Sequence, residues 1–186
     1  MPTPAIGGVG LLKQLDKAVG NRFTAEGQII YLLGETKGHL GASLYQRDVL
    51  GDDSVFAPPR VDLAAEAAHG ALVRAAIDKG LIAAAHDISD GGLAVALAEM
   101  AIGQNIGAEI SAEGDTGFWF GEDQARYVLA VDADKAAAFE ALAAGLPVQK
   151  IGTTTGAELK FGDTVTISVA QLHELNEGWF PALMQE

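Results

Sequence analysis

The stretch AHDISDGGLAVALAEM, residues 85–100, sets a polar turn with two glycines directly before one of the most apolar helical patterns in the chain. Its apolar positions fall on two faces of a predicted helix that starts at Gly91: Leu93, Ala96, Leu97 and Met100 on one, Val95 and Ile102 on the other. Because two sides of this helix are apolar, we expect it to be well buried.

The turn HDISDGG before that helix has two interpretations. In one, Ser89 or Asp90 caps the helix, an effect worth about 1 kcal/mol, and the glycines let strand and helix approach closely. In the other, the amides of Gly91 and Gly92 hold an anion at the positive end of the helix. Asp87 and Asp90 would repel a phosphate there unless they point away or a magnesium ion bridges them. The two roles are compatible.

Strand and helix patterns alternate on both sides of this stretch, and a run of strands follows late in the chain. We expect strands within 28–34, 81–89, 107–113, 126–132, 147–155, 157–162 and 164–170, and further helices from near Asp62, within 133–145 and within 171–184. The helix from Asp62 shows a stripe of mostly small residues: Val61, Ala65, Ala68, Leu72 and Ala75. This order predicts a single α+β domain, a layered α/β/α arrangement with a mixed β-sheet.

Composition excludes several classes of partner. The 186 residues carry 12 Lys and Arg against 25 Asp and Glu, a net charge of -13, so a nucleic-acid or anionic-membrane partner is not expected. An anionic small molecule is still compatible with this charge. Cysteine is absent, and no run approaches the roughly 18 apolar residues that span a bilayer. We expect a cytoplasmic protein.

The sequence indicates no catalytic or metal-ligating set. It contains no GxxxxGK[ST], GxSxG or HExxH motif, and no GxGxxG after a strand. The four histidines lie far apart, without ligand spacing: His39, His69, His86 and His173. For His69 and His173 we expect a structural or solvated role.

The loop GETKGHLGAS, residues 34–43, is a candidate anion site. Glycines let backbone amides face a ligand, and Lys37 and His39 add positive or protonatable groups. The loop lies between a predicted strand and a predicted helix, a position that favours anion binding. The alternative is a long flexible connection.

Glu122 and Arg126 form a second candidate, just ahead of a predicted strand in FGEDQARYVLAVD. They either form an ion pair with each other or bind ribose hydroxyls and phosphate beside a cleft. The sequence alone leaves both interpretations open.

Several stretches together resemble one family: PTPAIGGVGLL, YLLGETKGHLGASLYQ, HDISDGGLAVALAEMA and FGEDQARYVLAV occur in this order in phosphoribosylformylglycinamidine synthase. The resemblance covers nearly the whole chain and is to the C-terminal domain of the second half of the synthetase subunit. It implies a fold like the C-terminal domain of aminoimidazole ribonucleotide synthetase, which belongs to the same superfamily. Residues 1–27 would then be a lead-in from a preceding domain, and the chain a piece of a longer enzyme.

The family's activity is ATP-dependent C–N ligation in purine biosynthesis. By resemblance, ATP and magnesium activate the amide oxygen of formylglycinamide ribonucleotide, and glutamine-derived ammonia then displaces phosphate. The expected partners are the preceding ATP-binding domains, a glutaminase subunit, a small accessory subunit and small-molecule nucleotides. Because the family's catalytic groups lie in those preceding domains, the chain alone is expected to be inactive, with no certain cofactor of its own.

The resemblance can be followed residue by residue in the segment 122–126. Where the family's first half has Glu-Ser-Gln followed by Glu-Arg against the ribonucleotide, this chain has Glu122, Asp123, Gln124, Ala125 and Arg126. Asp123 and Ala125 depart from that pattern and argue against direct substrate binding by this half. By resemblance it would instead frame the second, pseudo-symmetric site, which holds a structural nucleotide in large family members.

The full candidate set for substrate or phosphate binding is Gly38, Gly41, Ser43, Ser89, Gly91, Gly92, Glu122 and Arg126. Two alternatives to a ligase domain remain. The chain is either a non-catalytic module that completes a pseudo-dimer, or a domain of another enzyme of the superfamily. SDGG stands here where the aminoimidazole ribonucleotide enzyme normally has Thr-Gly-Gly-Gly, which argues against the latter.

Overall fold

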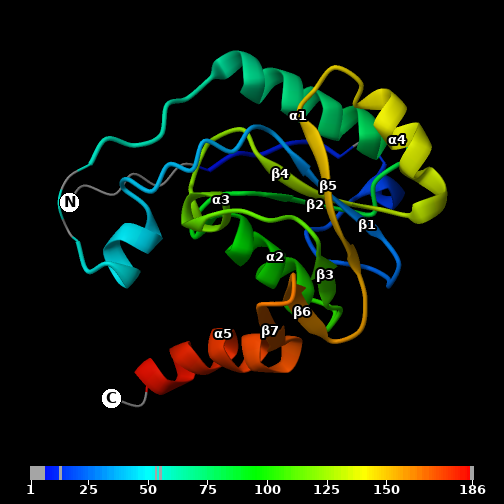
Figure 1. Ribbon diagram of the computed structural model, residues 1–186. Helices are drawn as coiled ribbons and strands as arrows, with labels where there is room; N and C mark the ends of the chain where they lie inside the picture. The colour runs from blue at the N-terminus through cyan, green and yellow to red at the C-terminus, as the bar shows by residue number, and fades with distance from the viewer. Residues whose placement is uncertain (1–6, 13, 53, 55, 185–186) are drawn as a thin grey trace.

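The computed structural model describes residues 7–12, 14–52, 54 and 56–184, in which one mixed sheet lies between two helical layers (Figure 1). The strands are β1 Ile29–Leu33, β2 Ala84–Asp87, β3 Ala108–Ile110, β4 Tyr127–Val131, β5 Val148–Thr154, β6 Glu158–Phe161 and β7 Val165–Ser168. The α-helices are α1 Leu63–Asp78, α2 Gly92–Ile102, α3 Thr116–Phe120, α4 Ala136–Leu142 and α5 Val169–Leu183. Short 3₁₀ turns lie at Leu15–Lys17 and Ala133–Lys135, and a π-helical turn at Tyr45–Val49.

The sheet order is β2-β4-β1-β5-β3-β6-β7. Only β3 and β6 pair in parallel, and every other neighbouring pair is antiparallel. The expected mixed sheet is therefore confirmed, as is the α+β class.

Strand alternation in β1 divides the core into two layers. Ile30 and Leu32 pack with α2, whereas Tyr31 and Leu33 pack toward α1 and α4. Successive side chains of a strand point to opposite faces, so one short strand contributes to both cores. Figure 1 shows α1 and α4 over one face of the sheet and α2 and α5 over the other. This is the predicted α/β/α layering.

Helix α1 begins as predicted, but its buried face differs from the predicted stripe. Asp62 caps it, accepting from the amides of Ala64 and Ala65 at 3.0 and 3.1 Å. The buried positions are His69, Leu72, Val73 and Ala76. Val61 lies before the helix and is 60% exposed, and Ala68 is exposed, so the predicted stripe was out of phase. Its alanines gave too little contrast in hydropathy to fix the face.

Helix α2 is the apolar helix of the opening stretch. Leu93, Ala96, Leu97 and Met100 are each at most 2% exposed, which confirms its burial. The predicted cap by Ser89 or Asp90 is wrong: the N-cap is Gly91, in a left-handed conformation, and neither side chain caps the helix. No helix of the described residues is long and apolar enough to cross a membrane.

The structure differs from the sequence-based expectations at three other places. The loop after β1 leads only to the five-residue turn Tyr45–Val49 rather than to a full helix. The short helix α3 was not predicted, since five residues with two phenylalanines and a tryptophan carry no helical period. Helix α5 begins at Val169, two residues before the expected 171, where Ser168 and Gln171 form a capping box.

Candidate functional site

The candidate residues meet where the loop after β1 lies against the segment between α3 and β4. Glu122 connects three parts of the chain at this point. Its Oε1 accepts from the Leu44 amide at 2.9 Å and from the Gly91 amide at 2.8 Å, and its own amide donates to the His39 carbonyl at 3.0 Å. The Glu122 carboxylate therefore caps α2 from outside, in place of Ser89 or Asp90.

Asp123 makes the corresponding connection to the glycine loop. Its Oδ2 accepts from the amides of Lys37 and Gly38, both at 2.8 Å. The side chain is buried, with the residue 6% exposed. Two adjacent amides that point at one oxygen form an anion-binding nest, and here the anion is the protein's own carboxylate.

Arg126 lies beneath this nest and is only 1% exposed. Its guanidinium donates to the carbonyl oxygens of Gly121 and Asp123 and to Thr36 Oγ1. Burial lowers the pKa of Arg126, which the nearby charge of Asp123 opposes. The ion pair with Glu122, one of the two interpretations of the sequence, does not form, because the guanidinium donates to these internal oxygens instead.

Close backbone contacts fix this arrangement. A Cβ on Gly117 would lie 2.8 Å from the Gly38 oxygen, and a Cβ on Gly92 would lie 2.8 Å from the Gly121 oxygen. Real Cβ atoms do not approach backbone so closely, so glycine is needed at these positions. The Gly-rich sequence here therefore serves packing between loops.

An open cleft of about 590 Å³ lies beside the nest, between the glycine loop and the start of α1. Its charged lining includes Glu35, Lys37, Arg60, Asp62 and Asp123. Within the part of the chain that the structure describes, neither Lys37 nor Arg60 has a side-chain hydrogen bond or ion pair. Both cations are therefore available to an anionic ligand.

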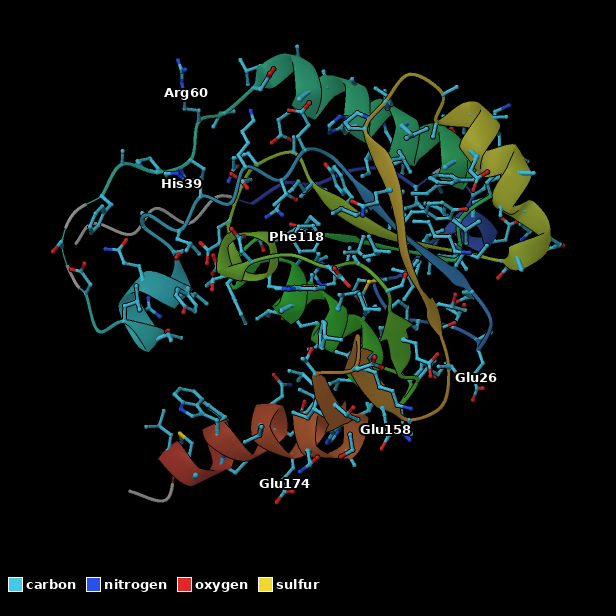
Figure 2. The ribbon with its side chains drawn as sticks, viewed as in Figure 1. Glu26, His39, Arg60, Phe118, Glu158 and Glu174 are labelled. Atoms are coloured by element: carbon cyan, nitrogen blue, oxygen red, sulfur yellow. The ribbon has the colours of Figure 1, made fainter. Side chains whose placement is uncertain are left out.

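The histidines at this cleft have partners in the protein. His39 Nε2 lies 2.9 Å from the Ala57 carbonyl, and Figure 2 shows Arg60 on the segment that leads to α1. His69 is 4% exposed, with Nδ1 2.7 Å from the Ala125 carbonyl oxygen. His69 thus has the structural role expected of it.

A second hollow of about 430 Å³ is lined by Ser43, Asp90 and Glu122, among others. The Ser43 hydroxyl donates to the Leu40 carbonyl at 2.6 Å and is buried. The hollow is bordered by acidic groups, and its one arginine, Arg47, is paired with Asp48 at 2.7 Å. It is a poorer place for an anion than the first cleft.

The structure brings most predicted residues together, though few are free to bind. Gly38 and Gly91 donate their amides to carboxylates, and the Gly92 amide donates to the Ser89 carbonyl at 3.1 Å. Ser89 is exposed, and Gly41 lies in the loop near Phe56. Among residues outside the predicted set, the structure adds Thr36, Arg60 and Asp123. The contacts of Thr36 and Asp123 join positions far apart in the chain, and Arg60 reaches the cleft only through the fold, so local sequence gave no signal beyond the unusual Asp123.

No group of three or more His, Cys, Asp or Glu side chains that could hold a metal occurs among the described residues. The side chains that the structure describes therefore offer no ready set of ligands for magnesium.

Comparison with known proteins places this geometry in context. Residues 25–163 match the family model "AIR synthase related protein, C-terminal domain". The chain is 51% identical over 190 residues to the phosphoribosylformylglycinamidine synthase subunit PurL of Parvibaculum lavamentivorans, covering 99% of this chain and 26% of that protein.

Two solved structures share the fold. PurL of T. maritima complexed with FGAR superposes with a TM-score of 0.71 at 20% identity, covering 86% of this chain and 30% of that one. The T. maritima protein complexed with ATP gives a TM-score of 0.65 at 18% identity, covering 86% and 28%. The chain spans about a quarter of the length of the curated relatives it matches.

Proposed function

This chain belongs to the family of AIR synthase related proteins, C-terminal domain, and on that premise we propose that it is the last large domain of a phosphoribosylformylglycinamidine synthase. One observation carries the proposal: 51% identity over 99% of the chain to a subunit of that name. The reaction would be ATP-dependent ligation of ammonia to formylglycinamide ribonucleotide. The domain contributes fold and binding surface to that enzyme and does not turn over substrate alone.

Within the domain, we assign nucleotide or substrate binding to the 590 Å³ cleft. Lys37 and Arg60 line it, and neither side chain is held in a hydrogen bond or ion pair among the described residues. Two such cations suit the phosphate of a ribonucleotide, even in a protein with a net charge of -13. Of the predicted residues, Gly38 lines the cleft, and Gly41 and Ser89 do not. Arg126 acts from beneath the cleft by holding the segment that forms its wall.

ATP would supply the phosphoryl group that activates the amide oxygen. The T. maritima protein of the same fold has been solved with ATP, which supports nucleotide use by the whole enzyme. This domain's own residues would position anionic groups through Lys37 and Arg60. Magnesium use belongs to the whole enzyme in this proposal, since the described residues offer no cluster of ligands for it, and no step here depends on the ion.

The partners proposed for the whole enzyme are the preceding ATP-binding domains, a glutaminase subunit and a small accessory subunit. They follow from the family and not from a surface of this domain. A cytoplasmic location and a single domain with residues 1–27 as lead-in stay predictions of the same kind.

A domain exchange tests the proposal. The matching quarter of the Parvibaculum lavamentivorans subunit is replaced by this chain, and synthase activity is measured with its partner subunits. The exchanged enzyme should keep kcat/KM within about tenfold of the parent, a difference of about 1.4 kcal/mol. A folded exchange enzyme without activity would contradict the assignment.

The same exchange separates a binding domain from a purely structural module. With Lys37→Ala and Arg60→Ala together, KM for a nucleotide substrate should rise at least about tenfold, because charge-assisted contacts are lost. The matched control, Lys79→Ala with Lys150→Ala, removes two exposed cations away from the cleft and should leave KM unchanged. An unchanged KM in both variants would favour the structural module.

A further inference from the structure

The nest at Lys37 and Gly38 has every element of an anion site, and a carboxylate fills it. Two amides converge on Asp123 Oδ2 at 2.8 Å each, and the buried guanidinium of Arg126 lies beneath, against the Asp123 backbone. Asp123 also forms part of the wall of the open cleft. An anion entering from the cleft therefore meets the Asp123 carboxylate at the point where a loop of this kind would hold a phosphate oxygen.

A phosphate oxygen and the Asp123 carboxylate cannot both occupy this nest. Each amide has one hydrogen to donate, and both hydrogens are used by one oxygen. A phosphate close by would also be repelled by the buried negative charge, where solvent screens little. The second pair of amides, at Leu44 and Gly91, is filled in the same way by Glu122.

We propose that Asp123 is the resident anion of the Lys37–Gly38 nest and determines specificity by excluding a ligand's phosphate from the glycine loop. The ligand's anionic group is then held by the side chains of Lys37 and Arg60 at the cleft. For its ligand the inference rests on the proposed function, but exclusion from the nest stands on the contacts alone. Asp123 is thus a specificity residue, and Gly38 is a structural glycine rather than a phosphate ligand.

Shortening Asp123 to serine should convert the nest into a phosphate site. Asp123→Ser removes the charge and the reach of the carboxylate, and leaves two amides directed at the cleft. It also removes the negative charge of Asp123 that acts on the buried guanidinium of Arg126. Both changes favour uptake of an external anion.

The experiment is a titration with inorganic phosphate, followed through the backbone amide resonances of the 186-residue chain. In Asp123→Ser, the Lys37 and Gly38 amides should shift saturably, with an apparent affinity at least about tenfold tighter than any that the wild-type side chains of Lys37 and Arg60 show for phosphate. Phosphate should also raise the Tm of this variant, because it binds only the folded state. In the wild type the two amides should not respond saturably.

Two controls separate the nest from general charge effects. Asp123→Asn keeps an oxygen that accepts from the amides, so the nest stays filled and affinity should not rise. Asp163→Ser removes one exposed negative charge at a distance and should behave as wild type. A folded Asp123→Ser that gains no phosphate affinity overturns the proposal, as does equal gain in Asp163→Ser.

The titration of the wild-type chain tests the proposal even if the Asp123→Ser variant does not fold. Saturable movement of the wild-type Gly38 amide overturns the proposal, whereas phosphate-dependent shifts confined to the side-chain resonances of Lys37 and Arg60 support it. Loss of activity in the domain exchange would leave this phosphate result unchanged, so failure of the proposed function and failure of this inference are distinguishable.

Discussion

The segment 117–126 buries charged side chains, whereas the last helix, α5, exposes apolar ones. In the first, Asp123 and Arg126 are 6% and 1% exposed although both are charged. In the second, Leu175 and Trp179 are 70% and 66% exposed although both are apolar. Burial in this domain therefore follows the availability of partners and not hydropathy alone.

The partners explain the difference. The polar groups of 117–126 meet backbone amides and the Thr36 hydroxyl of the glycine loop, so their desolvation is offset by hydrogen bonds. Helix α5 packs on the core through Val169 and Leu172, and Figure 1 shows its later turns extending away from the sheet. Past Leu172, the described residues offer little for its apolar side chains to pack against.

The largest effect on this contrast in burial is expected from a substitution of Arg126. Arg126→Met keeps an apolar volume but leaves the carbonyl oxygens of Gly121 and Asp123 without their guanidinium donor. We expect the free energy of unfolding to fall by about 3 to 5 kcal/mol, the scale for removing one partner from a buried charged network. Urea denaturation measures the change.

A matched arginine provides the control for that prediction. Arg74 is exposed on α1, and Arg74→Met should change stability by less than about 0.5 kcal/mol. If the two variants lose comparable free energy of unfolding, the loss at Arg126 is that of any arginine side chain, and the buried hydrogen-bond network contributes nothing of its own.

A second prediction concerns the close backbone contacts of the same region. Gly92→Ala places a Cβ 2.8 Å from backbone atoms of Phe120 and Gly121, at a positive φ of 73°. We expect a loss of about 2 to 4 kcal/mol from strain and displaced backbone. Gly80→Ala has a similar φ of 64° with open space around it and should lose only about 1 kcal/mol.

Differential scanning calorimetry on both variants separates the crowding at Gly92 from the cost of a left-handed residue. Equal Tm shifts would contradict the close packing of α2 against the 117–126 segment. Replacing Gly91 is less informative, because a Cβ there would meet Val95 at 2.4 Å and disturb folding and binding together.

The elements could be predicted from sequence because their signals are local. The strand pattern of 28–34 and the two-sided apolar pattern of α2 each lie within a few turns or residues, and both were placed correctly. The buried face of α1 was not placed correctly. His69 is polar yet buried against the Ala125 carbonyl, and the alanines of the helix gave no contrast in hydropathy.

The site was predictable only in outline. The glycine loop, the HDISDGG turn and Glu122 were all recognised as candidates, and the structure does bring them together. The way in which they contact one another was not predicted, because the hydrogen bonds from Lys37 and Gly38 to Asp123 join residues 86 and 85 positions apart. The sequence indicated backbone amides that could bind an anion. Only the fold shows that the anion is already part of the chain.

The smallest effect is expected on α5, where the comparison predicts tolerance. Trp179→Ser should change the free energy of unfolding of the chain by less than about 0.5 kcal/mol, because the side chain is 66% exposed. Leu172→Ala, on the part of α5 that packs against the core, should cost about 1 to 2 kcal/mol. Chemical denaturation of the two variants sharpens the contrast within one helix. A loss above about 2 kcal/mol for Trp179→Ser would mean that the outer turns of α5 are covered in solution, and the opposition between the two regions would then fail.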